Sequence, residues 1–358
     1  MRAPFLFLIG LAATAALVPV LVRLAPRLGL IDRPGGRKEH EGEVPLVGGL
    51  AIGAVFLGCF GVFRVEGEVS LWLGVAALLV LAAGALDDHR ELGSAAKFGF
   101  QIVAAWLLAQ FGGVALAHLG ELVSADRLWL GAAAVPFTVF AFVGVMNALN
   151  MADGLDGLAG GLALSATVWF GAAAALAGAN AALWIASLLA GALVGFLAYN
   201  APLPGRRRAH AFLGDAGSLF LGLVLAWLAA RLAMSEQPAL SPISAVWILG
   251  IPLADTVAIM LRRALRGRSP FSPDREHLHH LLLARGLSRP AVAWLMTAAS
   301  IAMGAAGLAA ERMGVPDYVL FYAYGVLWIV YYVLTSVAAA GMRRGSAAVA
   351  PNLGCPAS

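Results

Sequence analysis

The 358-residue chain is too apolar for a soluble protein. Hydrophobic residues make up 61% of it, charged residues only 12%, and its mean hydropathy is +0.85, whereas soluble domains carry about 25% charged residues. The formal charge of +4 comes from 24 Lys and Arg that form no continuous basic domain, which excludes a nucleic-acid-binding protein. Cys59 and Cys355 are too far apart to supply a disulfide framework or a metal cage. Most of the chain is therefore expected to lie in lipid.

Eleven apolar runs have roughly the 17 to 25 residues with which a helix crosses a bilayer. The first is too long for the core of a signal peptide, and Arg23 and Arg27 follow it, so we retain it as a helix. The pattern predicts an all-α polytopic membrane protein with one membrane-embedded domain (1–341) and a short cytoplasmic tail (342–358). The runs cover residues 4–24, 46–63, 70–86, 97–117, 128–146, 158–178, 179–199, 212–234, 243–261, 290–310 and 317–340.

The basic residues predict the orientation of these spans, because Lys and Arg near helix ends stay on the cytoplasmic side. Nineteen of the 24 fall in one set of connecting segments and the tail, and five on the other side. The N-terminus is therefore expected outside and the C-terminus inside. The predicted cytoplasmic loops are approximately residues 25–45, 87–96, 147–157, 200–211 and 262–289.

Five aspartates lie at predicted cytoplasmic helix ends, in segments that are otherwise apolar or small. A single aspartate there is usually a helix cap or a solvated loop residue. Five at one depth, joined by Asn147, Asn150 and Asn200 and by a histidine cluster, indicate a shared site. The five are Asp87, Asp88, Asp153, Asp156 and Asp215.

Asp87 and Asp88 place two carboxylates side by side where a span ends. Adjacent acids repel, which raises the proton affinity of one of them unless a cation intervenes. This suits either a general base or a divalent-metal site. Lys97, at the start of the next span, could bind a phosphate or anchor the helix at the membrane surface.

Polar side chains recur at every third position from Asn147 through Asn150 and Asp153 to Asp156. On a helix this spacing drifts slowly around one face, so the four could line one wall of a cleft. The segment contains no Lys or Arg. Its acids therefore need a metal, a distant base or a ligand donor.

Asp215 opens the eighth predicted span among small residues. Oxygen ligands from separate helices, completed by water and substrate phosphate, are what Mg²⁺ prefers. Phe212, just before it, could stack on a nucleotide base or lie at the membrane interface as many aromatic residues do.

The last predicted cytoplasmic loop holds His277, His279 and His280, three of the seven histidines of the chain. No nearby cysteine completes a zinc site. Because Arg275 and further arginines surround the histidines, an anion site for a diphosphate is favoured.

Acids for a metal and bases for phosphate, gathered at a membrane edge, favour phosphoryl transfer between a lipid head group and a soluble nucleotide. A proton-coupled transporter would place ionisable residues near the midplane, where only Asp255 is expected. A charge near the bilayer centre costs roughly 2.5–3.5 kcal/mol on the insertion scale. Asp255 is therefore expected either to pair with another side chain in a structural role or to point toward the cleft. An intramembrane prenyltransferase would explain the acids but not the histidines.

These motifs resemble the polyprenyl-phosphate N-acetylhexosamine-1-phosphate transferase family, and within it the WecA-like branch. The likeness covers essentially the whole membrane region: residues 37–40 and 45–49, the Asp87–Asp88 pair, residues 147–159, residues 214–215 and the His-Leu-His-His run at 277–280. The related muramyl-pentapeptide transferases carry three consecutive histidines, whereas Leu278 interrupts them here.

The resemblance implies transfer of an N-acetylhexosamine 1-phosphate, most often N-acetylglucosamine 1-phosphate, from its UDP donor to undecaprenyl phosphate, with release of UMP. Direct attack by the lipid phosphate is favoured over a covalent enzyme intermediate. The product would start a cell-surface glycan such as lipopolysaccharide or teichoic acid at the bacterial cytoplasmic membrane. The expected cofactor is Mg²⁺, with Mn²⁺ as the alternative. The expected partners are the two substrates and the bilayer, with a homodimer left open and no nucleic acid.

The resemblance also assigns roles to residues of this chain. Asp87 is the candidate base for the lipid phosphate, and Asp88 lies beside it in the metal-phosphate cluster. Asp215 and Asn150 are expected to bind Mg²⁺ with Asp88. The residues expected to hold the substrates are Lys38, Lys97, Asn147, Asp153, Asp156, Asn200, Phe212, Arg275, His277, His279 and His280.

Overall fold

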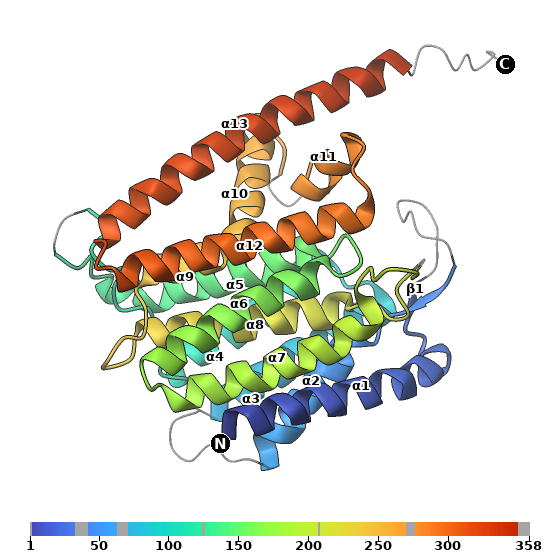
Figure 1. Ribbon diagram of the computed structural model, residues 1–358, viewed down its shortest axis with the longest axis horizontal. Coiled ribbons are helices and arrows are strands. Elements are labelled where there is room, and N and C mark those ends of the chain that lie inside the picture. The colour runs from blue at the N-terminus through green and yellow to red at the C-terminus, as the bar shows by residue number, and fades with distance from the viewer. Residues whose placement is uncertain are drawn as a thin grey trace.

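The computed structural model describes residues 2–32, 42–62, 71–123, 126–206, 208–269 and 276–349, and it is a bundle of α-helices (Figure 1). Apolar runs fold this way because lipid offers no hydrogen-bond partner to the backbone, which a helix satisfies internally. The helices are α1 (Arg2–Leu28), α2 (Gly48–Val62), α3 (Leu71–Arg90), α4 (Ser94–Phe111), the 3₁₀ helix η1 (Gly131–Ala133), α5 (Ala134–Ala152), α6 (Leu158–Leu176), α7 (Asn180–Asn200), α8 (Gly214–Ala233), α9 (Pro242–Ile248), α10 (Gly250–Leu265), α11 (Leu278–Ala284), α12 (Arg289–Arg312) and α13 (Asp317–Val349).

The chain is a polytopic membrane protein with eight to nine candidate spans among the described residues. Eight helices are long and apolar enough to cross a bilayer: α1, α3, α5 with η1, α6, α7, α8, α12 and α13. The bent pair α9–α10 makes a ninth if it is one span, and α2 is a shorter apolar helix. Each of the eleven predicted runs overlaps a helix, but the count of eleven and the orientation stay predictions.

The predicted span over residues 243–261 is bent, because α9 and α10 meet at an angle of 86°. Gly250 begins α10 directly after the break, and Pro252 lies in its first turn. Proline is tolerated in a first helical turn, where its missing N–H leaves no bond unmade, but it cannot continue a helix that precedes it. The bend places Asp255 early in α10, beside residues of the last loop.

The fold is all-helical apart from one small antiparallel sheet. Strand β1 (Ile31–Asp32) pairs with β2 (Val44–Pro45), with Ile31 opposite Pro45. Leu46, the residue after β2, forms a parallel bridge with Phe212. The first predicted cytoplasmic loop is thereby attached to the start of α8.

Helix α8 forms the centre of the bundle. Nearly all of its residues are buried, and it packs against α2, α3, α5 and α6. Small residues allow the close approach, as lipid-embedded helices require. A Cβ added to Gly49 would collide with the backbone of Gly217, and one on Gly84 with that of Ala216. Gly49 and Gly84 therefore allow α2 and α3 to pack closely on α8.

The remaining helices flank this centre. Helices α1 and α7 pack on each other along one side, while α12 contacts α6 and α9 on the other (Figure 1). Strand β1, α11 and the last turns of α13 lie toward the same end of the bundle, at the right of Figure 1. Helix α13 continues to Val349, so the boundary predicted at residue 341 falls inside a continuous helix.

Candidate active site

The end of α3 and the start of α8 are joined by the carboxylate of Asp88. Its Oδ1 accepts the backbone N–H of Asp215 at 2.8 Å, and its Oδ2 accepts that of Ala216 at 3.1 Å. The first N–H groups of a helix have no partner within the helix, and a carboxylate there also interacts favourably with the helix dipole. Gly214 makes the turn with φ +73°, and a Cβ on it would collide with Asp88. The structure thus places Asp88 next to Asp215, as the sequence predicts.

Lys97 lies between the two acidic segments. Its Nζ forms ion pairs with Asp87 and with Asp215, the latter at 2.8 Å. Asp87 is buried, and its Oδ1 also accepts the N–H of Leu92 at 2.6 Å. The lysine, from the first turn of α4, therefore neutralises two carboxylates that come from α3 and α8.

Asn150 and Asp153 bring the end of α5 to the same place. The Nδ2 of Asn150 donates to Asp215 Oδ1 at 2.8 Å and to Ser218 Oγ at 2.9 Å. Asp153 keeps solvent contact, but the protein around its carboxyl, followed by the charges of Asp215, Asp88 and Asp156, raises its pKa to about 8. Carboxylates from three segments are therefore close enough to act on one another.

Asn147 and Asn200, predicted to bind substrate, hold other parts of the protein in this structure. Asn147 donates to Gln101 Oε1 at 2.5 Å and to the carbonyl of Val143 at 2.8 Å. Buried Asn200 accepts the N–H of Gly157 at 2.8 Å and donates to the carbonyl of Ala211 at 2.9 Å. Asn147 therefore links α5 to α4, and Asn200 joins the two loops that contain Gly157 and Ala211.

The loop over residues 200–213 is fastened to the acidic segment and to β2. Asp156 Oδ2 accepts the N–H of Ala209 at 3.0 Å. Phe212 donates its N–H to the carbonyl of Pro45 at 2.8 Å and accepts that of Gly48 at 2.9 Å. An open hollow of about 460 Å³ lies in this loop and is lined by Leu203, Pro204, Gly205, Arg206, Arg208 and His210.

The histidines reach the acidic segment through His279. This residue is buried, and a Cβ on Gly154 would lie 2.5 Å from its Nε2. Burial lowers the pKa of His279 to about 3, and the charges of His280 and His277 add to the effect. The rings of His279 and His280 lie with centroids 4.2 Å apart, and those of His277 and His279 stack at 5.6 Å. The cluster and the acids therefore form one continuous region.

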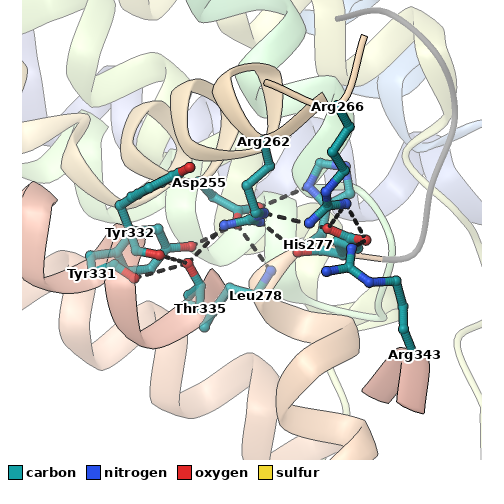
Figure 2. Close-up of polar contacts among 10 residues, drawn as sticks. Asp255, Arg262, Arg266, His277, Leu278, Tyr331, Tyr332, Thr335 and Arg343 are labelled. Carbon is teal, nitrogen blue, oxygen red and sulfur yellow. Dashed lines mark hydrogen bonds and ion pairs between the residues drawn. The ribbon is translucent and has the colours of Figure 1, made fainter. Parts of the chain in front are cut away.

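Several residues of this region are not predicted from the sequence (Figure 2). Glu276 forms ion pairs with Arg262, Arg266 and Arg343, so these arginines are occupied by a protein carboxylate instead of standing open for a diphosphate. The one signal was the position of Glu276 directly before His277 in an arginine-rich loop. Lys38 and Arg275, both predicted to bind substrate, lie outside the described residues.

Fold and site together define a helical membrane protein that gathers carboxylates, a lysine and histidines at one end of its bundle. The family model described as "Glycosyl transferase family 4" matches residues 70–233, which include α3 to α8 and all five predicted aspartates.

Three bacterial relatives carry the name undecaprenyl-phosphate alpha-N-acetylglucosaminyl 1-phosphate transferase. The protein of Escherichia coli (strain K12) is 34% identical over 86% of this chain and 84% of its own length. That of Salmonella typhi is 35% identical over 86% and 84%, and that of Haemophilus influenzae is 33% identical over 91% and 92%. The chain belongs to glycosyl transferase family 4, and the resemblance stated from its motifs is confirmed.

Proposed function

We propose that this chain transfers N-acetylglucosamine 1-phosphate from UDP-N-acetylglucosamine to undecaprenyl phosphate and releases UMP. The relatives' names supply the lipid acceptor and the sugar phosphate. The observation that carries the proposal is the convergence of Asp87, Asp88 and Asp215 on Lys97 and on the first turn of α8. Phosphoryl transfer depends mainly on positioning and on neutralising charge, and this cluster does both.

In the proposed reaction, an oxygen of the lipid phosphate attacks the β-phosphorus of the donor. The bond from that phosphorus to the bridging oxygen breaks, and UMP leaves with the oxygen and its electron pair. Asp87 is the candidate base for a lipid phosphate that arrives protonated. Lys97 holds a positive charge between Asp87 and Asp215, where phosphate oxygens would also be attracted.

A divalent cation fits the donor chemistry of this region. Asp88, Asp215 and Asn150 offer the oxygen atoms that Mg²⁺ prefers, and Mn²⁺ accepts the same ligands. Among the described residues, no three His, Cys, Asp or Glu side chains are arranged to hold an ion by themselves. Mg²⁺ is usually held by one or two carboxylates with substrate phosphates and water, which agrees with that finding. When bound, the ion would neutralise charge on the phosphates.

The nucleotide end of the donor is proposed to lie along Asp153, Asp156 and Phe212, with the hollow in the 200–211 loop beside them. His277, His279 and His280 are proposed to meet phosphate or sugar. The substrate contacts of Lys38 and Arg275 stay predictions. We place the protein in the bacterial inner membrane with this site at the cytoplasmic face. Most Lys and Arg residues lie in the same set of connecting segments as the site, and such residues stay on the cytoplasmic side.

The test is turnover by the purified protein in detergent with Mg²⁺, UDP-N-acetylglucosamine and undecaprenyl phosphate. UMP and a lipid-linked sugar diphosphate are expected in equal amounts. Asp215→Asn and EDTA are each expected to remove nearly all turnover. Asp317→Asn is the matched control, because Asp317 accepts the N–H of Glu121 and lies at the far end of α13. Turnover of a different UDP-sugar alone, or none with this lipid, would contradict the proposal.

A further inference from the structure

The carboxylate of Asp255 is buried and makes three hydrogen bonds, to two parts of the chain (Figure 2). His277 Nδ1 lies 2.8 Å from its Oδ2, and the N–H of Leu278 lies 3.0 Å from its Oδ1. Tyr331, on α13, donates its hydroxyl to Oδ1 at 2.6 Å. A buried carboxylate is tolerated only when it is bonded in this way. Asp255 is thus the point where α10, α11 and α13 meet.

These bonds determine which nitrogen of His277 is available. An ionised carboxylate can only accept hydrogen bonds, so the Nδ1 facing it carries the proton. The Nε2 is then the ring nitrogen left for a ligand, as in metal sites and catalytic sites where a carboxylate orients a histidine. The ring plane is fixed as well, because His277 stacks on His279 with an angle of 11° between the planes.

Asp255 also positions the backbone of α11. The helix has seven residues, and its N-cap residue, His277, makes no side-chain capping bond. The first N–H groups of a helix need an outside acceptor, and Asp255 supplies one to Leu278. Nearby, Arg262 of α10 binds Thr335 Oγ1 at 2.8 Å and the carbonyl of Glu276 at 2.9 Å. Glu276 and Leu278, on either side of His277, are therefore both held from α10.

We propose that Asp255 is a positioning residue for the transfer reaction, and that it acts through His277. It keeps Nδ1 protonated and sets the direction of Nε2 beside the acidic segment, which His279 contacts at Gly154. The inference rests on the function proposed above and adds a residue outside the acidic cluster to it. Tyr331 completes the arrangement from α13.

A double-mutant cycle tests this on the full-length protein. Asp255→Asn keeps the shape of the side chain and removes its charge, and loss of such a supporting partner typically costs about 10- to 100-fold in activity. We expect that loss in kcat, with less than about 3-fold change in the KM for UDP-N-acetylglucosamine. His277→Ala is expected to lower kcat by a larger factor than Asp255→Asn. In the His277→Ala background, Asp255→Asn is expected to cost no further activity, because residues that act as one unit are not additive.

Two controls separate positioning from structural damage. Glu311→Gln changes another acid that accepts a backbone N–H, that of Ser241 at 2.8 Å, far from the histidines in sequence. It is expected to keep kcat within about 2-fold, as most substitutions away from a site do. Asp255→Glu restores the charge and is expected to recover part of the activity lost in Asp255→Asn. If Asp255→Asn lowers kcat by the same factor in the wild type and in His277→Ala, the inference is overturned.

Nitrogen-15 NMR of histidine-labelled protein tests the geometry without turnover. The signal of His277, assigned by its loss in His277→Asn, is expected to report a protonated Nδ1. An unprotonated Nδ1 would overturn the inference even if Asp255→Asn fails to fold. Absence of wild-type turnover with a protonated Nδ1 would overturn the proposed function and leave the arrangement intact. An active wild type with additive losses would overturn only the role of Asp255.

Discussion

The ring of His279 lies directly against Gly154, with Nε2 2.5 Å from the place where a Cβ would stand. This contact joins the histidine helix α11 to the acidic segment after α5. Without a side chain at residue 154, the buried imidazole can approach the backbone beside Asp153. The two motifs lie more than 120 residues apart in sequence, yet they share one wall of the site.

We therefore predict that Gly154→Ala lowers kcat/KM by about 10-fold or more, because overpacking of this kind costs about 1–3 kcal/mol and each 1.4 kcal/mol is tenfold. The methyl group would push His279 away from the acids. Steady-state kinetics of UMP release is the measurement. Gly99→Ala is the matched control, since open space surrounds that position on α4. Equal activities of the two variants would contradict the proposed contact.

A second prediction concerns Lys97, which pairs with both Asp87 and Asp215. Lys97→Met leaves two neighbouring carboxylates without their cation, and unpaired charges of this kind destabilise a protein. We expect a lower Tm without metal and a larger rise in Tm on adding Mg²⁺ than in the wild type, because the ion would neutralise the same acids. Arg285→Met, at an exposed position, controls for loss of a positive charge. An unchanged Tm in Lys97→Met would argue against the pairing.

The sequence predicts that the acids converge because each lies at a helix end of the same membrane depth. Asp88, Asp153 and Asp215 need only the helices to pack for their side chains to meet. The structure brings Asp88 to Asp215, while the orientation predicted from charge placement stays a prediction.

Other features depend on packing that one sequence does not reveal. The hydrogen bonds of Asn200 to Gly157 and Ala211 require two loops to approach each other, and an asparagine looks the same whether it binds a loop or a substrate. Asp255 reads as an isolated charge in a span until the 86° bend brings it to His277. The partner Tyr331 lies 76 residues further on, with no pattern that marks it.

A third prediction separates loop support from substrate contact at Asn200. Asn200→Ala leaves the N–H of Gly157 and the carbonyl of Ala211 without partners in a buried place, which costs about 1–3 kcal/mol for each unsatisfied group. We expect a clearly lower Tm and a higher KM for UDP-N-acetylglucosamine with a smaller change in kcat. Thermal unfolding in detergent and steady-state kinetics are the measurements. A raised KM with an unchanged Tm would instead indicate direct contact with the donor.

The last prediction follows from the raised pKa of Asp153, about 8. It concerns how the free energy of unfolding changes with pH, which depends on the protons bound by the folded and the unfolded chain. A carboxyl has a pKa near 3.9 when unfolded, so between about pH 4 and pH 8 the metal-free folded protein binds a proton that the unfolded chain does not. The free energy of unfolding therefore falls as pH rises through this window and levels off above it. A cation bound at the neighbouring Asp215 favours the ionised form of Asp153, so Mg²⁺ is expected to raise the Tm more at pH 8 than at pH 6. Asp153→Asn is expected to reduce both dependences. Thermal unfolding at the two pH values, with and without Mg²⁺, measures them, and an equal Mg²⁺ effect at both would count against Asp153 lying close to the ion.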